Sequence, residues 1–374
     1  MKICFRLGNL MFELRGDGPL ASAAREEIPA QMLCENDGPA DVVYEFGNIN
    51  IPSGDSVYVG AYRVGKGWIY IDDKYLPSLI SMEAGRMHVT VGCRVDLLGK
   101  PGISALLKPV DHAYNNVWGR ISKRFYYSIF NQTSQLYQLA HGQTYCHASA
   151  CTDGQRTVLL MAWGGVGKTS SLLQLLNSSE SWRFISDDQA VLDRKGSVYR
   201  TPFRMQIYPY NLEGEDRLRA ALMGRRSLFD KAQWQIRQRL MGKKSVRRRV
   251  QAEEFLGAGR GAASAPVTHA FFLRRTGGTE FADHSVSTED LALQMSHVMH
   301  YELGMLGNLL AASTSVGSRD EGFGFDMTIA SELDAVADIV RAGLGHMRAQ
   351  PTLLDVPFKA QPADLLQAVL ARID

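Results

Sequence analysis

The sequence lacks any apolar run long enough to span a membrane. A membrane-crossing helix needs roughly 18 or more consecutive apolar residues, and polar or charged residues interrupt each hydrophobic stretch of this 374-residue chain sooner. Residues 1–18, MKICFRLGNLMFELRGDG, also carry charges too early for the apolar region of a secretory signal. We therefore expect a cytoplasmic protein without a membrane partner.

The sequence also contains few cysteines, carries little net charge and shows no internal repeat. The five cysteines are odd in number and lack the paired spacing of zinc ligands, so we expect structural thiols in a reducing compartment. A formal net charge of +2 gives the whole molecule little attraction for nucleic acid or anionic lipid. These absences indicate an ordinary globular protein, and a hydrophobic content of 45% allows a substantial core.

The apolar pattern predicts two domains with mixed α/β structure. Segments rich in Val, Ile and Tyr recur through residues 1–110 and indicate β-strands. Residues 117–140 carry apolar side chains at helical spacing, which predicts a helix leading into the second domain. The Gly- and Ala-rich segment 257–266 predicts a flexible connection. We expect a β-rich domain at 1–115, suited to a substrate or partner, and an α/β domain at 116–374.

One short segment carries a specific chemical signal. AWGGVGKT, residues 162–169, lies between an apolar strand pattern and a leucine-patterned helix, and it matches G-x-x-x-x-G-K-[ST] with Ala162 in place of the first glycine. Glycines let successive backbone N–H groups turn inward around phosphate oxygens, and the following helix adds its positive end. The residues expected to bind nucleotide are Gly164, Gly165, Val166, Gly167, Lys168, Thr169 and Ser170.

Two further patterns assign chemistry around this loop. Lys168 is expected to contact the β- and γ-phosphates and Thr169 to bind a metal ion, so the predicted cofactors are ATP and Mg²⁺. FISDD ends an apolar run with Asp187 and Asp188. One of these carboxylates can hold the metal while the other accepts a proton from a hydroxyl. His147 is on the preceding strand pattern and would lie near Asp187 if the two strands pair.

In this order, HAS, AWGGVGKTS and FISDD resemble the catalytic domain of HPr kinase/phosphorylase, which has the phosphoenolpyruvate carboxykinase-like P-loop fold. The resemblance covers about residues 140–205. It implies that Asp187 is the base that activates a serine hydroxyl with assistance from His147, and that Lys168 supports catalysis. It also implies that Asp188 and Thr169 hold the metal, and that the chain forms a homo-oligomer, because the HPr enzymes are hexamers.

The chain departs from that family after the acidic pair. The family's Arg- and Gly-rich signature, tied to the reverse, phosphate-releasing reaction, does not align with TPFRMQIYPYNLEGED at 201–216. The chain is therefore more similar to the diverse HPr-kinase-related proteins found beside biosynthetic genes, whose substrates include peptides and small hydroxylated molecules. The expected activity is transfer of the γ-phosphoryl group of ATP to a hydroxyl of a peptide, protein or small metabolite.

Two other functional classes are weighed against this one. A nucleotide-dependent binding or switch protein needs one metal-binding Asp and no second base, so the acidic pair favours the kinase. A carboxykinase-like enzyme is disfavoured because no additional set of metal ligands is evident. His297 and His300 lie three residues apart on one expected helix without a third ligand, which favours a packed or surface helix over metal binding.

Positive charge is concentrated in residues 217–260, which hold 13 basic and three acidic residues for a local net charge of +10. We expect a basic helical insertion here, and three interpretations are open: a solvated face, a nucleic-acid patch, or a lid over phosphates. The nucleic-acid interpretation lacks interleaved aromatic residues. We favour the lid, because arginine binds phosphate bidentately. Arg204, closer in sequence to the acidic pair, is a further candidate.

Overall fold

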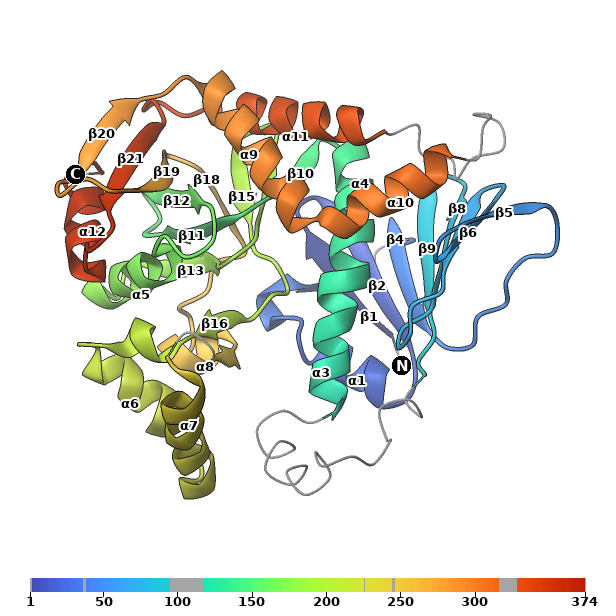
Figure 1. The fold of residues 1–374 in the computed structure, drawn as a ribbon, viewed down its shortest axis with the longest axis horizontal. Helices are drawn as coiled ribbons and strands as arrows, with labels where there is room; N and C mark the ends of the chain where they lie inside the picture. The colour runs from blue at the N-terminus through green and yellow to red at the C-terminus, as the bar shows by residue number, and fades with distance from the viewer. Residues whose placement is uncertain are drawn as a thin grey trace. The chain divides into compact units, whose positions relative to one another are not determined.

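The computed structural model describes residues 2–35, 38–94, 117–224, 226–243, 246–315 and 328–373. The chain divides into two compact units, Met1–His141 with His300–Ala335 and Gly142–Met299 with Val336–Asp374. Both units combine helices with β-sheet (Figure 1), which confirms the expected mixed α/β class. Within the described ranges, no helix is long and apolar enough to cross a membrane.

The first unit is built on a nine-stranded sheet. Its strands are β1 (Lys2–Leu7), β2 (Leu10–Gly16), β3 (Leu33–Cys34), β4 (Val42–Phe46), β5 (Ser56–Val59), β6 (Tyr62–Gly65), β7 (Trp68–Ile71), β8 (Ser78–Glu83) and β9 (Arg86–Val91). They lie in the order β3-β1-β2-β4-β9-β8-β7-β6-β5. Every second residue of β9, RMHVTV, is buried, because alternate side chains point to opposite faces of a sheet.

One face of this sheet packs against a continuous helical segment. α3 (Val117–Arg124), a π-helical segment (Phe125–Phe130) and α4 (Asn131–Ala140) follow one another. The ring centroids of Tyr44 in β4 and Phe130 lie 5.1 Å apart. The opposite face of the sheet carries a hollow of about 470 Å³, lined by residues of β4, β7, β8 and β9. The unit also contains α1 (Pro19–Arg25) and α10 (Gly304–Thr314).

The second unit contains a six-stranded, a four-stranded and a two-stranded sheet. The six-stranded sheet has the order β13-β11-β12-β19-β21-β20, the second β10-β14-β15-β18, and the third pairs β16 with β17. The strand bounds are β10 (Gln143–Cys146), β11 (Ala148–Thr152), β12 (Thr157–Ala162), β13 (Arg183–Ser186), β14 (Ala190–Asp193), β15 (Ser197–Tyr199), β16 (Met205–Ile207), β17 (Arg248–Val250), β18 (Ser264–Pro266), β19 (His269–Thr276), β20 (Ala282–Ser285) and β21 (Thr352–Pro357).

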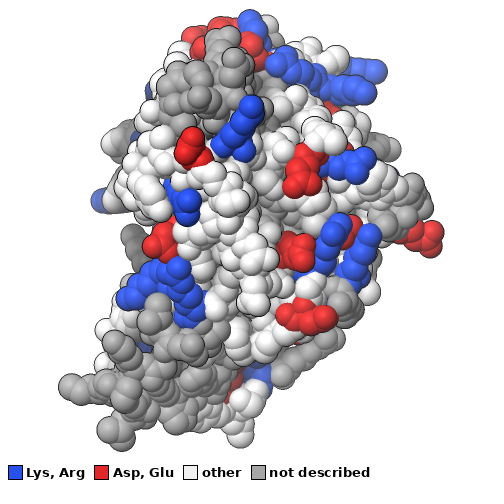
Figure 2. All heavy atoms as spheres, turned by 90° about the vertical axis from the view of Figure 1, so that its right-hand side faces the viewer, with Lys and Arg blue, Asp and Glu red and all other residues white. Residues whose placement is uncertain are grey.

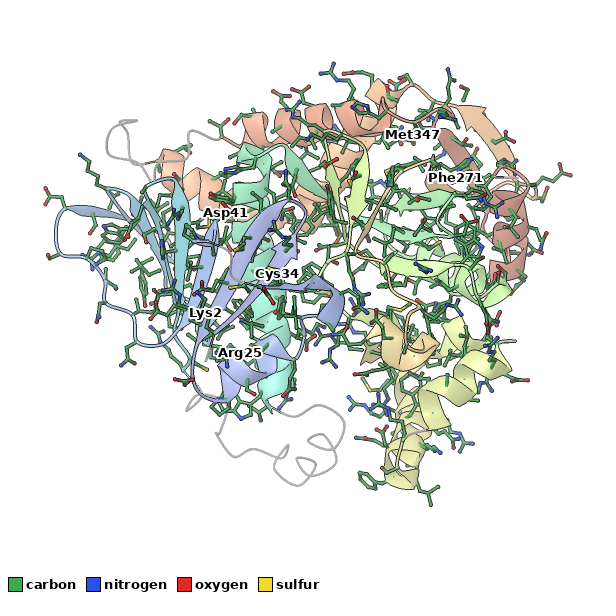
Figure 3. All side chains as sticks on the ribbon, turned by 180° about the vertical axis from the view of Figure 1, so that it is seen from behind. Lys2, Arg25, Cys34, Asp41, Phe271 and Met347 are labelled. Carbon is green, nitrogen blue, oxygen red and sulfur yellow. The ribbon has the colours of Figure 1, made fainter. Side chains whose placement is uncertain are left out.

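Helices α5 and α12 share an apolar core with the six-stranded sheet. That core includes Leu160 of β12, Leu172 of α5, Leu354 of β21 and Leu365 of α12. Phe271 of β19 belongs to the same core and lies among these strands in Figure 3. The helix bounds are α5 (Lys168–Ser178), α6 (Asp216–Gly224), α7 (Leu228–Met241), α8 (Ala252–Leu256), α9 (Thr288–Glu302), α11 (Ile329–Leu344) and α12 (Pro362–Leu370).

The division between the units differs from the one expected at residue 115. Residues 117–141 group with the N-terminal sheet, as do residues 300–335. The physical reason is the aromatic packing between the helical segment and the sheet, for example Phe130 against Tyr44.

The segment 257–266, expected to be a flexible connection, forms backbone hydrogen bonds with strand β13. The Phe184 N–H donates to the Arg260 carbonyl (2.7 Å), and the Ala262 N–H donates to the Phe184 carbonyl (2.8 Å). The insertion at 217–260 contains helices α6, α7 and α8 but also strand β17. Figure 2 shows the right-hand side of the view in Figure 1, where strands β5, β6 and β8 are drawn, and on that face basic and acidic side chains are interspersed.

Candidate functional site

The candidate site lies at one edge of the six-stranded sheet in the second unit. β11 is antiparallel to both of its neighbours, β12 and β13, so its first residues meet the ends of those two strands. This arrangement brings His147, just before β11, beside the loop after Ala162 and the acidic pair after Ser186. The three sequence motifs therefore meet in space.

The loop between β12 and α5 has a glycine-dependent backbone. Gly165 and Gly167 have φ angles of 77° and 115°, in the left-handed region that side chains disfavour. Gly167 is the N-cap of α5, so the helix begins at Lys168. The first N–H groups of a helix have no intrahelical partners, and here they lie at the loop. This strand–loop–helix geometry suits an anion such as phosphate.

The remaining loop residues have different surroundings. Gly164 is exposed, whereas the side chain of Val166 is buried in the apolar core, which leaves its backbone for a ligand. Ser170 is buried, and its Oγ accepts a hydrogen bond from Asn211 Nδ2 (2.8 Å). The hydroxyl of Ser170 thus fixes the first turn of α5 against the following chain.

Lys168 crosses the base of the loop, and its side chain is only 6% exposed. Nζ donates to the carbonyl oxygens of Ala162 (3.0 Å) and Trp163 (3.2 Å), and it lies 3.2 Å from His147 Nε2. A buried ammonium at this position adds positive charge beside the glycine loop. The lysine expected to contact phosphate therefore lies at the loop.

Asp187 is buried and bonded to the threonine of the loop. Its Oδ1 accepts hydrogen bonds from Thr169 Oγ1 (2.9 Å) and Ser149 Oγ (2.7 Å), and Oδ2 is buried without a hydrogen-bond partner among the described residues. Burial raises the pKa of Asp187, and the negative charge of Asp188 raises it further. A buried carboxylate beside a hydroxyl offers the oxygen ligands that Mg²⁺ prefers.

Asp188 pairs with the histidine instead. Its Oδ1 lies 3.2 Å from His147 Nε2, and its Oδ2 accepts from Gln206 Nε2 (3.2 Å). Burial acts to raise the pKa of Asp188, but the hydrogen bond and charge of His147 and the charges of Lys168 and Arg247 outweigh it, so this pKa is lowered. The side chain is 39% exposed, so an ionised carboxylate faces outward here.

These contacts differ from the pairing expected from the sequence. His147 lies beside Asp188 rather than Asp187, and Thr169 is bonded to Asp187 rather than Asp188. Asp188 has a φ of 70°, which is uncommon outside glycine and turns the chain directly after Asp187. Strained backbone of this kind clusters at functional sites. The two carboxylates therefore have separate partners.

The sequence interpretation missed Ser149 and Gln206, and it did not single out Arg247 among the basic residues of 217–260. Ser149 lies two residues after His147, a spacing that places both on one face of a strand, so this signal was present in HAS. Gln206 belongs to β16, and Arg247 immediately precedes its antiparallel partner β17. Arg247 Nη1 donates to the Tyr208 hydroxyl (3.0 Å). No local pattern could link this ribbon to the acidic pair, because the ribbon joins segments distant in sequence.

The histidines of α9 are not part of a group of metal ligands among the described residues. Nowhere in the described part of the chain do three or more His, Cys, Asp or Glu residues gather as metal ligands. His300 Nδ1 lies 3.0 Å from Glu332 Oε2, and His297 is exposed. His297 therefore faces solvent on α9, and His300 lies beside a carboxylate.

Comparison of the chain with protein-family models finds no match, and comparison with curated proteins finds no similar sequence. The candidate function therefore depends on the residues and geometry of the site.

Asp187→Asn is expected to stabilise the fold at neutral pH. Because the pKa of Asp187 is raised, the folded protein holds its proton more tightly than the unfolded chain, and ionisation of this group as pH rises destabilises the fold. An amide removes that effect. We expect Tm at pH 7 to rise and the difference to shrink as pH falls toward the ordinary Asp pKa of about 3.9.

Asp355→Asn is a control for which the opposite change in Tm is expected. A hydrogen bond from Arg274 is the main cause that lowers the pKa of Asp355, so Asp355→Asn should reduce Tm at pH 7. Calorimetry at several pH values measures both variants. A reduced Tm for Asp187→Asn at pH 7 would contradict the raised pKa.

Proposed function

We propose that the protein is a phosphotransferase that moves the γ-phosphoryl group of ATP to a hydroxyl group. One observation carries this proposal: a glycine loop with its lysine, a buried carboxylate bonded to the loop threonine, and a second, ionised carboxylate beside a histidine meet at one sheet edge. Phosphoryl transfer needs these elements, because its catalysis consists mainly of positioning and charge neutralisation.

The residues fit ATP and Mg²⁺. The loop backbone and Lys168 would hold the phosphates, while Asp187 and Thr169 would hold the metal. The buried Oδ2 of Asp187 has no protein partner among the described residues, which supports this assignment. Bound Mg²⁺ supplies positive charge that offsets the phosphate oxygens. Because a nucleotide contributes oxygens of its own to Mg²⁺, no larger cluster of protein ligands is needed.

Asp188 is the residue proposed to accept the proton. It is ionised, partly exposed and hydrogen-bonded to His147, which would orient it. The acceptor oxygen forms a bond to the γ-phosphorus as the bond from that phosphorus to the bridging oxygen of ADP breaks. The hydroxyl proton passes to Asp188, and ADP leaves. The family resemblance implies the opposite roles, with Asp187 as the base and Asp188 at the metal. We exchange them because Asp187 is bonded to Thr169 and Asp188 lies beside His147.

We extend the proposal to the fold and setting. The order of HAS, the glycine loop and FISDD on β11, β12 and β13 supports an HPr kinase-like P-loop fold for the second unit. On the same resemblance we propose a cytoplasmic protein that forms a homo-oligomer. The hollow on the first unit's sheet offers a place for part of a substrate or partner.

The activity is tested by incubating the protein with ATP, Mg²⁺ and a library of serine-containing peptides and hydroxylated metabolites. Mass spectrometry should find a product heavier by one phosphoryl group, formed only when Mg²⁺ is present. If ATP binds but no acceptor is modified, a nucleotide-dependent switch becomes the better description. If ATP does not bind at all, the phosphate-loop assignment itself is wrong.

Arg247→Gln is expected to reduce phosphoryl transfer by roughly 10–100-fold and to change ATP affinity less. The charge of Arg247 reaches Asp188, and arginine stabilises charge on a transferring phosphoryl group. Arg226→Gln is a matched control, because Arg226 is an exposed arginine of the same insertion. Kinetics and calorimetry on both variants separate transfer from binding. Equal rates for Arg247→Gln and wild type would remove Arg247 from the mechanism.

A further inference from the structure

Helix α7 exposes most of its apolar side chains, whereas its buried side chains are mainly polar. Its buried residues are Asp230, Gln233 and Trp234. Two of them contact Arg248 of β17, whose guanidinium forms an ion pair with Asp230 and lies 4.9 Å from the Trp234 ring centroid. The inner face of α7 is therefore held mainly by polar and cation–π contacts. Figures 1 and 3 show α7 projecting away from the sheets of its own unit.

The outer face of α7 is apolar. Leu228, Phe229, Ile236 and Leu240 are 83%, 53%, 55% and 80% exposed, and Ala232 between them is also exposed. At about 100° per residue, these five positions fall within an arc of about 120°, and the exposed Arg239 lies within the same arc. An apolar stripe of that width normally faces a protein core. We name these five residues the outer stripe.

The charges around the outer stripe indicate the chemistry of its partner. Lys231, Arg237 and Arg239 lie on α7, and Lys243 follows it, paired with Glu213. The single acidic residue of α7 is Asp230, which is buried and paired with Arg248. Like charges oppose pairing of two copies through this face, whereas an acidic amphipathic helix matches both the apolar residues of the face and its positive charges, Arg239 within the arc and Lys231 and Arg237 on either side.

The same contacts connect α7 with the proposed site. Arg248, which holds α7, sits between Arg247 and Arg249 at the start of β17. Gln206 of β16 pairs in register with Arg249 and donates to Asp188. A polypeptide on α7 would therefore be docked on the element that also supplies Arg247 to the site. This connection to the proposed site favours a polypeptide acceptor over a lipid surface as the partner of α7.

We propose that the outer stripe of α7 docks an acidic amphipathic segment of the polypeptide that accepts the phosphoryl group. This inference rests on the proposed function and narrows its acceptor to a peptide or protein. The docking segment is distinct from the phosphorylated residue, so it adds affinity without entering the reaction.

The probe is a fluorescein-labelled synthetic helix of roughly 18 residues, with leucine along one face and glutamate along the other. Fluorescence anisotropy should show saturable binding to the full chain, and the same peptide with lysine for glutamate should not bind. Phe229→Ser/Ile236→Ser/Leu240→Ser should weaken binding by about tenfold or more. Leu293→Ser, at an exposed leucine of α9, is the matched control and should bind normally.

Further measurements keep this inference separate from the proposed function. Lys168→Ala should still bind the probe, since docking does not need nucleotide, and the triple variant should bind ATP normally. Lys231→Glu/Arg239→Glu tests the charge without removing apolar surface and should weaken the probe similarly. Probe affinity unchanged by both multiple variants overturns the inference. So does a stripe-dependent binding to phosphatidylglycerol/phosphatidylcholine vesicles without probe binding, or stripe-dependent self-association in sedimentation velocity.

Discussion

Lys168→Ala is expected to reduce ATP turnover by about 10³-fold while the fold remains intact. The ammonium of Lys168 is held at the base of the glycine loop by two carbonyl oxygens, where it would offset charge on the β- and γ-phosphates. Its removal takes away this charge, yet the lost hydrogen bonds involve backbone groups at the edge of a sheet. Calorimetric titration with ATP, turnover assays and circular dichroism measure binding, rate and fold.

Lys195→Ala provides the matched control. Lys195 is an exposed lysine in the turn between β14 and β15, so its removal should change neither ATP affinity nor turnover. If Lys168→Ala retains both the affinity and the rate of the wild type, the loop does not bind nucleotide and the proposed function fails with it.

The loop could be predicted from the sequence because its determinants are local. A strand, a glycine-rich turn and a helix lie within consecutive residues, and Gly165 and Gly167 have the positive φ angles that only glycine adopts easily. The mixed α/β class could be predicted for the same reason, since strand and helix periodicity are properties of short windows.

The partners within the site depend on contacts that no short window contains. The strand order places β11 between β12 and β13, so His147 meets a carboxylate 41 residues away. Which of two adjacent aspartates it meets depends on the left-handed backbone at Asp188. Likewise, the sequence predicts a helical insertion at 217–260, but the buried pair of Asp230 with Arg248 decides which face of α7 is turned inward.

Asp188→Asn is expected to lower phosphoryl transfer by on the order of 10²–10⁴-fold while ATP and Mg²⁺ still bind. The amide keeps the shape of the side chain but cannot accept the hydroxyl proton. Asp187→Asn should instead raise the Mg²⁺ concentration needed for half-maximal rate, because it removes the carboxylate bonded to Thr169. Rates measured across a Mg²⁺ titration distinguish these two effects within a matched pair of substitutions.

The pH dependence gives this comparison a second readout. Because the pKa of Asp188 is lowered, the base stays ionised from neutral pH down to below the ordinary Asp pKa of about 3.9, so its protonation should not limit the rate above that value. Ser149→Ala removes a hydrogen bond that lowers the pKa of Asp187, and should therefore raise the Mg²⁺ concentration needed for half-maximal rate, as expected for Asp187→Asn and not for Asp188→Asn. If Asp187→Asn loses transfer at saturating Mg²⁺ while Asp188→Asn changes only the metal titration, the roles follow the family resemblance and not the contacts. If both variants transfer phosphoryl groups at the wild-type rate, neither carboxylate serves the reaction and the phosphotransferase mechanism is wrong.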